Sequence, residues 1–378
     1  MARAPLLVDV TAAAAAKHTG VARWIEGFCA HLRSRGIPFQ TTSACDWAAQ
    51  LGPIRQRALR TRVLRDLIYY SRVLPRLSAQ YERVVILDNV ARLVAPLPAT
   101  ARPFYLIHDI IPLEMSDTFV LQTAGARAAL LWKLTRRIYR WRFRRVVFAT
   151  GARFGCISKA TQASMERTFG SMANRGEWIG PMMLRIANSD DSNCDGRIAS
   201  LAMQQPYVLA LGTGDPKKGL ESLLNAWQRT AIDDHLRLIL FGDAWQARAG
   251  SAMRRKLREL EASNIVHVGG VCDATLQFLY RHAKAFVFPS RFEGLGLPPA
   301  EYAEAGGGEL ILRDIPSLRE IYGDVARFFA TDEELIALLK ALPDSRAPLI
   351  SPELRRETLR RRLDSSATFD RLCTAIME

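Results

Sequence analysis

The sequence predicts an α/β protein with two doubly wound, Rossmann-like domains. Its 378 residues suffice for two domains, because one domain typically takes about 100 to 200 residues. Short apolar runs alternate with loops and helical patterns in both halves of the chain, as in doubly wound sheets. A polar stretch at residues 188–196 interrupts this alternation. We therefore expect an N-terminal domain in residues 1–200, a C-terminal domain in residues 201–350, and a helix in residues 351–378 that returns to the N-terminal domain.

Four apolar runs in the N-terminal half predict buried strands of a parallel sheet. These runs lie at residues 5–10, 84–87, 104–107 and 154–157. His108 directly follows the third run, and ligands of open α/β sheets bind beyond the carboxyl ends of the strands. This position favours a functional role for His108. A structural histidine at the end of a strand is the alternative.

The C-terminal half restarts the alternation with four further apolar runs. These lie at residues 207–212, 238–242, 265–269 and 286–288. The loop after the first of them carries Lys217 and Lys218 and leads directly into a helical pattern. Lysine charges beside the free amides of a helix N-terminus form a binding site for phosphate. The P-loop sequence G-x-x-x-x-G-K-[ST] is absent, so this phosphate site is of another class.

Two carboxylates frame the loop that follows the last apolar run. Glu293 lies at the tip of this loop, and Glu301 follows in the first turn of a helix that a Pro-Pro pair opens. Carboxylates in these places can accept hydrogen bonds from the hydroxyl groups of a sugar or a ribose. The alternatives are that Glu301 only complements the helix dipole and that Glu293 is a solvated loop residue.

These motifs together resemble the donor-binding region of the retaining family 4 glycosyltransferases, or glycosyl transferases group 1. The resemblance rests on E-G-L-G-L-P at residues 293–298, G-T-G-D-P-K-K-G-L at residues 212–220 and I-P-S-L-R-E at residues 315–320. It implies the GT-B fold, in which two Rossmann-like domains face each other across a cleft. The string H-D-I-I-P-L at residues 108–113 is similar to a signature of members that transfer mannose and related sugars to bacterial surface polysaccharides.

The resemblance implies roles for the matching residues. Three are implied to be catalytic, with His108 and Glu293 at the donor sugar and Lys218 at the leaving phosphates. The implied donor-binding residues are Gly20, Gly212, Thr213, Lys217, Lys218, Val271, Glu293, Gly294, Leu295, Gly296, Leu297 and Glu301. Among them Glu301 meets the ribose, the amides of residues 294–297 meet the diphosphate, and Val271 lies in a loop beside the base. No metal ligand is implied.

Two of these positions depart from the family pattern. Lys217 stands in the place of the usual arginine, and a lysine is a point charge without the bidentate fork of a guanidinium. The loop before the first helix of the chain has Gly20 as its one glycine, where many relatives have two. A plain strand-to-helix turn is the alternative interpretation of this loop.

The net charge of +14, from 52 basic and 38 acidic residues, calls for an anionic partner. Two segments place arginines among aromatic and aliphatic residues: one begins at Arg55 and ends at Arg76, and the other begins at Arg127 and ends at Arg145. Basic amphipathic helices with aromatic residues are typical of proteins that lie on anionic membranes. The alternative is that each helix packs its apolar side on its own domain.

Several classes of protein are disfavoured by the sequence. The longest apolar run, residues 6–16, is too short to cross a bilayer, and we expect no secretion signal. The six cysteines form no C-x-x-C pair, which indicates neither a zinc site nor a disulfide framework. No zinc-finger spacing or RNP-type motif is present, so we expect no nucleic-acid partner.

The resemblance implies a hexosyltransferase that retains the anomeric configuration and needs neither a metal ion nor a cofactor. Its implied co-substrate is a GDP- or UDP-linked sugar, with mannose favoured by the H-D-x-x-P-L resemblance. The implied acceptor is a glycan or a polyprenyl-diphosphate-linked saccharide in the synthesis of a surface polysaccharide such as lipopolysaccharide. We expect a cytoplasmic protein on the inner face of the membrane. The alternatives are a non-catalytic subunit that binds sugar nucleotides and a basic nucleic-acid-binding protein.

Overall fold

The computed structural model describes residues 4–15, 20–53, 61–88, 96–117, 119–120, 126–149, 151–182, 193–230, 232, 235–242, 264–345 and 347–378. Three expected features lie wholly or partly outside this set: residues 16–19 of the first loop, residues 54–60 of the first basic segment, and residues 188–192 of the linker. The chain forms two compact units. The first comprises Met1–Leu184 and Asp364–Glu378, and the second comprises Arg185–Leu363.

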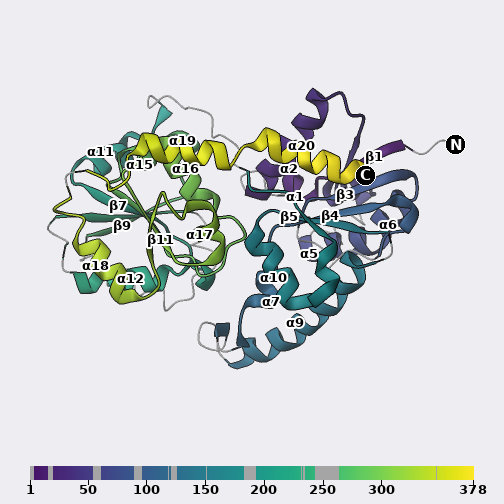
Figure 1. Cartoon of the computed structure of the whole chain (residues 1–378), viewed down its shortest axis with the longest axis horizontal. Coiled ribbons are helices and arrows are strands. Elements are labelled where there is room, and N and C mark those ends of the chain that lie inside the picture. The colour runs from purple at the N-terminus through teal and green to yellow at the C-terminus, as the bar shows by residue number, and fades with distance from the viewer. Residues whose placement is uncertain are drawn as a thin grey trace. The chain divides into compact units, whose positions relative to one another are not determined.

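The first unit is built on a parallel sheet of six strands in the order β2-β1-β3-β4-β5-β6. The strands are β1 Ala4–Asp9, β2 Gln40–Thr42, β3 Tyr81–Ile86, β4 Pro103–Ile107, β5 Arg153–Cys156 and β6 Gly176–Trp178. The helical segments are α1 Thr11–Ala15, α2 Gly20–Ser34, α3 Ala44–Ala49, α5 Arg62–Ile68, η1 Tyr69–Val73, α6 Leu74–Ser78, η2 Ala99–Ala101, α7 Ile111–Glu114, α9 Ala126–Val147, α10 Lys159–Phe169, η3 Gly170–Arg175 and α20 Ser365–Met377. Helices lie on both faces of this sheet (Figure 1).

The C-terminal helix α20 completes the core of the first unit. Phe369 packs its ring 5.2 Å from Trp24 and 5.7 Å from Phe28, both on α2. A polar contact adjoins this packing. The Asp370 carboxylate accepts a hydrogen bond from Arg35 at 2.6 Å. The last residues of the chain therefore stabilise the helix that begins at Gly20.

In the described part of the first basic segment, residues 61–76, the aromatic side chains are buried. Tyr69, Tyr70 and Leu74 are fully buried in the cluster beneath the sheet, and the Tyr69 hydroxyl makes a 2.8 Å hydrogen bond with Thr42. Its aromatic rings therefore stabilise the domain and are not presented to a partner.

The second unit is built on another parallel sheet of six strands, in the order β12-β11-β10-β7-β8-β9. The strands are β7 Tyr207–Leu211, β8 Arg237–Phe241, β9 Ile265–Gly269, β10 Ala285–Phe288, β11 Glu309–Arg313 and β12 Arg327–Phe329. The helical segments are α11 Gly196–Met203, η5 Pro216–Lys218, α12 Leu220–Thr230, α15 Asp273–His282, α16 Leu297–Ala305, α17 Pro316–Tyr322, α18 Asp332–Lys340 and α19 Pro352–Arg362. Here too helices cover both faces (Figure 1).

The sequence periodicity explains these elements. All four residues of β10 are buried, as expected of a strand covered by helices on both faces. Helix α12 buries Leu220, Leu223, Leu224 and Trp227, which recur at helical spacing on one side. The α/β class with two parallel sheets is confirmed.

The strand order locates a switch point in the second sheet. The chain starts at the central strand β7, winds outward through β8 and β9, and then crosses back to β10 on the other side of β7. At such a reversal the loops after the two central strands separate and leave a crevice at their carboxyl ends, where ligands of doubly wound sheets bind. The loops after β7 and β10 are the two for which the sequence predicts donor contacts.

Candidate functional site

The two loops at the switch point meet through one ion pair. The Lys218 ammonium group donates a hydrogen bond of 2.5 Å to Oε1 of Glu293 and lies 5.7 Å from the centre of the Phe288 ring. The Glu293 side chain is 11% exposed and the Lys218 side chain 27%. An ammonium group has three protons, so Lys218 can hold Glu293 and still donate to an anion.

Backbone contacts fix the distance between these loops. The Lys217 carbonyl accepts hydrogen bonds from the Arg291 amide at 2.7 Å and from the Ser290 hydroxyl at 3.3 Å. Gly219 adopts a φ of +66°, and a Cβ atom there would overlap the carbonyl oxygen of Pro289. The close approach of these two loops therefore requires glycine at position 219.

Lys217 and Lys218 differ in their surroundings. Asp215 caps the short helical turn η5 by accepting a hydrogen bond from the Lys217 amide at 3.0 Å, and its carboxylate also lies 3.4 Å from the Lys217 ammonium. Lys217 is thus held by an acid on its own loop, whereas Lys218 is directed to the acid on the opposite loop.

Glu301 lies one residue deeper in its helix than the sequence predicts. Helix α16 begins at Leu297, so Glu301 is its fifth residue and lies beyond the first turn; that expectation was wrong because the helix starts before the proline pair. The side chain is 6% exposed, and Tyr280 directs its hydroxyl to the carboxylate at 3.5 Å. This burial excludes the alternative that Glu301 is only a surface charge at the start of the helix.

The start of α16 is shaped by Gly296. Its φ of +76° is left-handed, and a Cβ atom would lie 2.6 Å from Leu318. The hydroxyl of buried Tyr322 donates a 2.6 Å hydrogen bond to the Gly296 carbonyl. Burial raises the pKa of Tyr322 well above its usual value, and the nearby Glu301 and Glu293 carboxylates add to this effect. The hydroxyl therefore stays protonated and keeps the loop of residues 294–297 in place.

The other expected donor residues lie in neighbouring loops of the same sheet edge. The Gly212 amide donates to the Phe241 carbonyl at 2.7 Å, and the Gly242 amide donates to the Gly269 carbonyl at 2.7 Å. These contacts join the loops after β7, β8 and β9. Thr213 is buried beside Gly212, and Val271 is half-buried two residues after Gly269.

His108 and Gly20 belong to the first unit. His108 follows β4, is 8% exposed, and its Nε2 lies 2.6 Å from the Leu87 carbonyl oxygen, an acceptor that requires a proton on that nitrogen. The indole of Trp24 meets the imidazole edge-on at 5.9 Å. Gly20 is the first residue of α2 and half-buried. His108 is thus held rigidly at the carboxyl edge of the first sheet.

A buried acid lies at the same edge, at the end of β1. Asp9 accepts hydrogen bonds from the Thr11 hydroxyl at 2.7 Å, from the Thr11 amide at 3.2 Å and from the Tyr70 hydroxyl at 2.7 Å. Burial raises the pKa of Asp9 to about 6 in spite of these donors. The sequence did not single out Asp9.

Sequence reasoning also missed the polar groups that support the switch-point loops: Ser222, Tyr280, Arg313, Tyr322 and Asp332. Each is an ordinary member of a helix or strand pattern, so no local motif identifies it. Their contacts join segments about 20 to 110 residues apart, which only the folded chain brings together.

Two further observations concern metal ions and membranes. Within the described ranges, no three His, Cys, Asp or Glu side chains are grouped so that they could hold a metal ion. Among the helices that the structure describes, none combines the length and apolar character needed to span a bilayer.

Comparisons with known proteins find similarity to glycosyltransferases. Residues 197–344 match the family model described as "Glycosyl transferases group 1". The chain is 36% identical over 124 residues to "O-antigen chain mannosyltransferase B" of Escherichia coli, a match that covers 32% of each protein. It is 29% identical over 148 residues to "O-antigen chain mannosyltransferase RfbU" of Salmonella typhimurium, covering 38% of this chain and 40% of that protein.

Solved structures match along the whole chain. "WaaG, a glycosyltransferase involved in lipopolysaccharide biosynthesis" has a TM-score of 0.64 at 15% identity, and the match covers 98% of this chain and 99% of that one. "Anabaena Alr3699/HepE in complex with UDP and glucose" has a TM-score of 0.63 at 15% identity and covers 99% of both chains. The GT-B fold and the resemblance to polysaccharide-synthesis glycosyltransferases are confirmed.

Proposed function

We propose that this chain, which has the GT-B fold and whose residues 197–344 match the glycosyl transferases group 1 family, is a retaining hexosyltransferase. In this proposal the second unit binds a nucleotide sugar and the first unit binds the acceptor. The observation that carries it is the Lys218–Glu293 pair at the switch point between β7 and β10. A cation and a carboxylate side by side suit a ligand with both a diphosphate and sugar hydroxyl groups.

Lys218 and the helix start of α16 serve the leaving group in this mechanism. The bond that breaks joins the anomeric carbon to an oxygen of the diphosphate, so negative charge grows on that oxygen. A lysine ammonium and the amides of residues 294–297 stabilise this charge more in the transition state than in the ground state. Lys217, Gly212 and Thr213 line the approach to the same phosphates.

The remaining donor residues hold the sugar and the nucleoside. Glu293 accepts hydrogen bonds from sugar hydroxyls, Glu301 accepts them from the ribose, and Val271 packs beside the base. The acceptor oxygen bonds to the anomeric carbon on the face that the diphosphate leaves, and its proton passes to the departing phosphate oxygen. Two residues of the first unit take part in this proposal: His108 acts at the donor sugar, and Gly20 is a donor-binding residue. The mechanism requires no metal ion and no cofactor.

The similarity to O-antigen mannosyltransferases favours GDP-mannose as donor and a glycan or polyprenyl-diphosphate-linked saccharide as acceptor. UDP-linked sugars are the second class of donor. The chain spans about a third of the length of the first of these relatives, so the donor and acceptor are inferred from a shared segment.

A panel of nucleotide sugars tests this function. Thermal stability is measured with GDP-mannose, UDP-glucose, UDP-galactose, GDP and UDP, and we expect the true donor and its diphosphate product to raise the melting temperature. Transfer to a lipid-linked acceptor is then followed by NMR of the new anomeric proton. A product of the same anomeric configuration as the donor supports retention, and an inverted product contradicts it.

Attachment to a membrane is part of the proposed function, and helix α9 provides it. The inner side of α9 packs in the core, with Phe143 stacked 5.3 Å from Phe169. Its outer side carries an apolar stripe at helical spacing that is half or more exposed: Leu130, Leu131, Leu134, Ile138 and Trp141. An exposed stripe of this length suits insertion into the interface of a bilayer.

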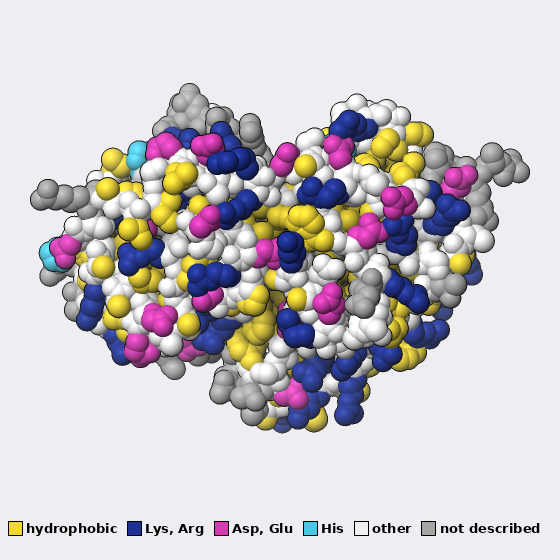
Figure 2. Space-filling view, viewed as in Figure 1, with side chains coloured by type: hydrophobic (Ala, Val, Ile, Leu, Met, Phe, Trp, Pro, Cys, Tyr) yellow, Lys and Arg dark blue, Asp and Glu magenta, His cyan; other side chains and the backbone are white. Residues whose placement is uncertain are grey.

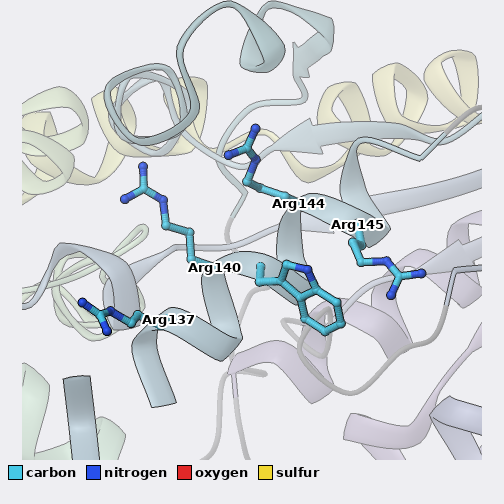
Figure 3. Close-up of a pocket in the computed structure, with 5 residues that line it drawn as sticks. Arg137, Arg140, Arg144 and Arg145 are labelled. Carbon is cyan, nitrogen blue, oxygen red and sulfur yellow. The ribbon is translucent and has the colours of Figure 1, made fainter. Parts of the chain in front are cut away.

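Arginines border this stripe. Arg137, Arg140, Arg144 and Arg145 line a shallow hollow of about 390 Å³ around Trp141, and the Arg145 guanidinium lies 5.0 Å from the indole. The guanidinium groups of Arg140 and Arg145 point away from each other (Figure 3), so they reach separate phosphates rather than one compact ligand. Figure 2 shows blue side chains gathered with yellow ones over α9 at the lower edge of the view.

None of the four arginines forms an ion pair with a carboxylate in the described part of the chain. Their charge is therefore available to the anionic headgroups of a bilayer. We place the protein on the cytoplasmic face of the membrane, where lipid-linked acceptors are extended.

A further inference from the structure

Arg313, the last residue of β11, is a buried cation in the second unit with 9% of its surface exposed. Its guanidinium donates hydrogen bonds to the Pro289 carbonyl at 3.1 Å, the Ala330 carbonyl at 3.2 Å and the Ser222 hydroxyl at 2.9 Å. It also lies 4.9 Å from the centre of the Phe329 ring. Burial removes solvation from the guanidinium and lowers its pKa, and these contacts offset the lost solvation.

One of the three acceptors begins a loop of the switch-point site, and another lies in the helix that directly follows the other loop. Pro289 directly follows β10 and begins the loop that carries Glu293. Ser222 is the third residue of α12, four residues after Lys218. A single guanidinium therefore donates one hydrogen bond to the start of the loop that carries Glu293. It donates another to helix α12, which follows the loop that carries Lys218.

Asp332 completes the cluster from the first residue of α18. Its carboxylate accepts a hydrogen bond from the Ser222 hydroxyl and lies 3.6 Å from Nη2 of Arg313. The hydroxyl thus accepts from a cation and donates to an anion, which fixes its orientation. The three side chains form one connected network behind the loops.

We infer that Arg313 is a positioning residue that sets the separation of the two loops and thereby the alignment of Lys218 with Glu293. The inference rests on the proposed function, because it assigns to that pair the grip on the donor diphosphate. A planar guanidinium suits this task, since it holds several acceptors at fixed separations, which a lysine ammonium cannot do.

The test combines a ligand-free measurement with ligand binding in Arg313→Met. Acetylation of Lys218 by a soluble acylating reagent is followed by mass spectrometry, with Lys340 on α18 as the internal reference. We expect Lys218 to react several-fold faster in the variant, because a loosened ion pair exposes the amine. Calorimetric titration with GDP and UDP is expected to show about tenfold weaker binding of the preferred diphosphate.

Arg355→Met is the matched control. Arg355 is also a buried guanidinium of the second unit, 1% exposed, but it donates to the carbonyls of Val325, Gly307 and Ile350, away from both loops. A stability loss alone is expected in this variant, with Lys218 reactivity and diphosphate affinity unchanged. If Arg313→Met does not fold, Arg313→Lys replaces it, and methylguanidinium is added to Arg313→Ala to restore the affinity.

The outcomes separate the two claims. Lys218 reactivity and affinity equal to wild type in folded Arg313→Met overturn the positioning role, as does an equal change in Arg355→Met. Failure of the wild-type protein to bind GDP or UDP contradicts the proposed function, while the acetylation rates still decide whether Arg313 aligns the pair.

Discussion

At the scale of single residues, the pair formed by Lys218 and Glu293 carries the proposed chemistry. We predict that Lys218→Ala and Glu293→Gln each lower kcat about 100-fold or more, because each removes a preorganised charge or acceptor at the reacting centre. The free energy of unfolding should fall by about 1 to 3 kcal/mol, because the Glu293 side chain is mostly buried and the pair loses one partner. Steady-state transfer rates and urea unfolding check this.

Lys217→Ala is the matched control for that prediction. Lys217 stands next in sequence but is held by Asp215, so its removal should lower kcat less than that of Lys218. Near-wild-type rates in both Lys218→Ala and Glu293→Gln would remove the site assignment.

Gly219 offers a second test at this scale. An alanine side chain there is strained by the φ of +66° and overlaps the Pro289 carbonyl, so the two loops must separate. Gly36 has the same φ, but a Cβ atom added there would have no other atom within 4 Å, so Gly36→Ala reports the strain alone. We predict that Gly219→Ala loses about 1 to 3 kcal/mol more unfolding free energy than Gly36→Ala. Equal losses would mean that the loop contact contributes nothing.

Asp9 makes stability depend on pH. Its pKa is raised from 3.8 to about 6 by burial, so the unfolded chain releases this proton first as the pH rises. The free energy of unfolding should therefore fall by roughly 3 kcal/mol between about pH 4 and pH 6 through this group. Asp9→Asn should flatten that part of the curve in urea unfolding. An unchanged slope in the variant would show that Asp9 is not responsible.

At the scale of elements, helix α9 carries the exposed apolar and basic side chains to which we assign membrane binding. We predict that exchanging three of its arginines for glutamine weakens binding to phosphatidylglycerol vesicles about 100-fold, because each basic residue contributes about 1 kcal/mol at an anionic surface. The residues are Arg137, Arg140 and Arg144. Cosedimentation with vesicles measures the change.

The control removes the same charge from exposed arginines of the second unit. These are Arg197, Arg229 and Arg361. Leu131→Ser with Leu134→Ser should weaken binding as well, since it removes the inserted side chains without changing charge. Absence of vesicle binding in the wild-type protein would end the membrane proposal.

Sequence patterns predict most of the long buried elements. Strands β7 to β10 and the start of α12 follow from continuous apolar runs and helical spacing. Strands β2, β6 and β12 are three residues long, too short for a periodic signal, and were not predicted. Strand β11, which is five residues long and fully buried, was not predicted either. The tyrosines of η1 fit a membrane-facing and a core pattern equally well, because composition does not show which side of a helix meets the sheet.

At the scale of the whole chain, the candidate site residues are divided between the two units. The family resemblance assigned the lysine loop and the acidic loop to one donor site, and the structure joins these loops through Lys218 and Glu293. The buried support behind them could not be predicted, since the contacts of Arg313, Ser222 and Asp332 depend on the order of strands in the folded sheet. His108 lies in the first unit, whereas Glu293 and Glu301 lie in the second.

The central claim is that the switch point of the second sheet binds a nucleotide sugar through Lys218. Its most direct measurement is a calorimetric titration of wild-type protein and Lys218→Ala with GDP-mannose and UDP-glucose. We expect the wild-type protein to bind one of these donors and the variant to bind it at least about tenfold more weakly. Equal affinities in the two proteins, or no binding of either donor to the wild type, would contradict the account.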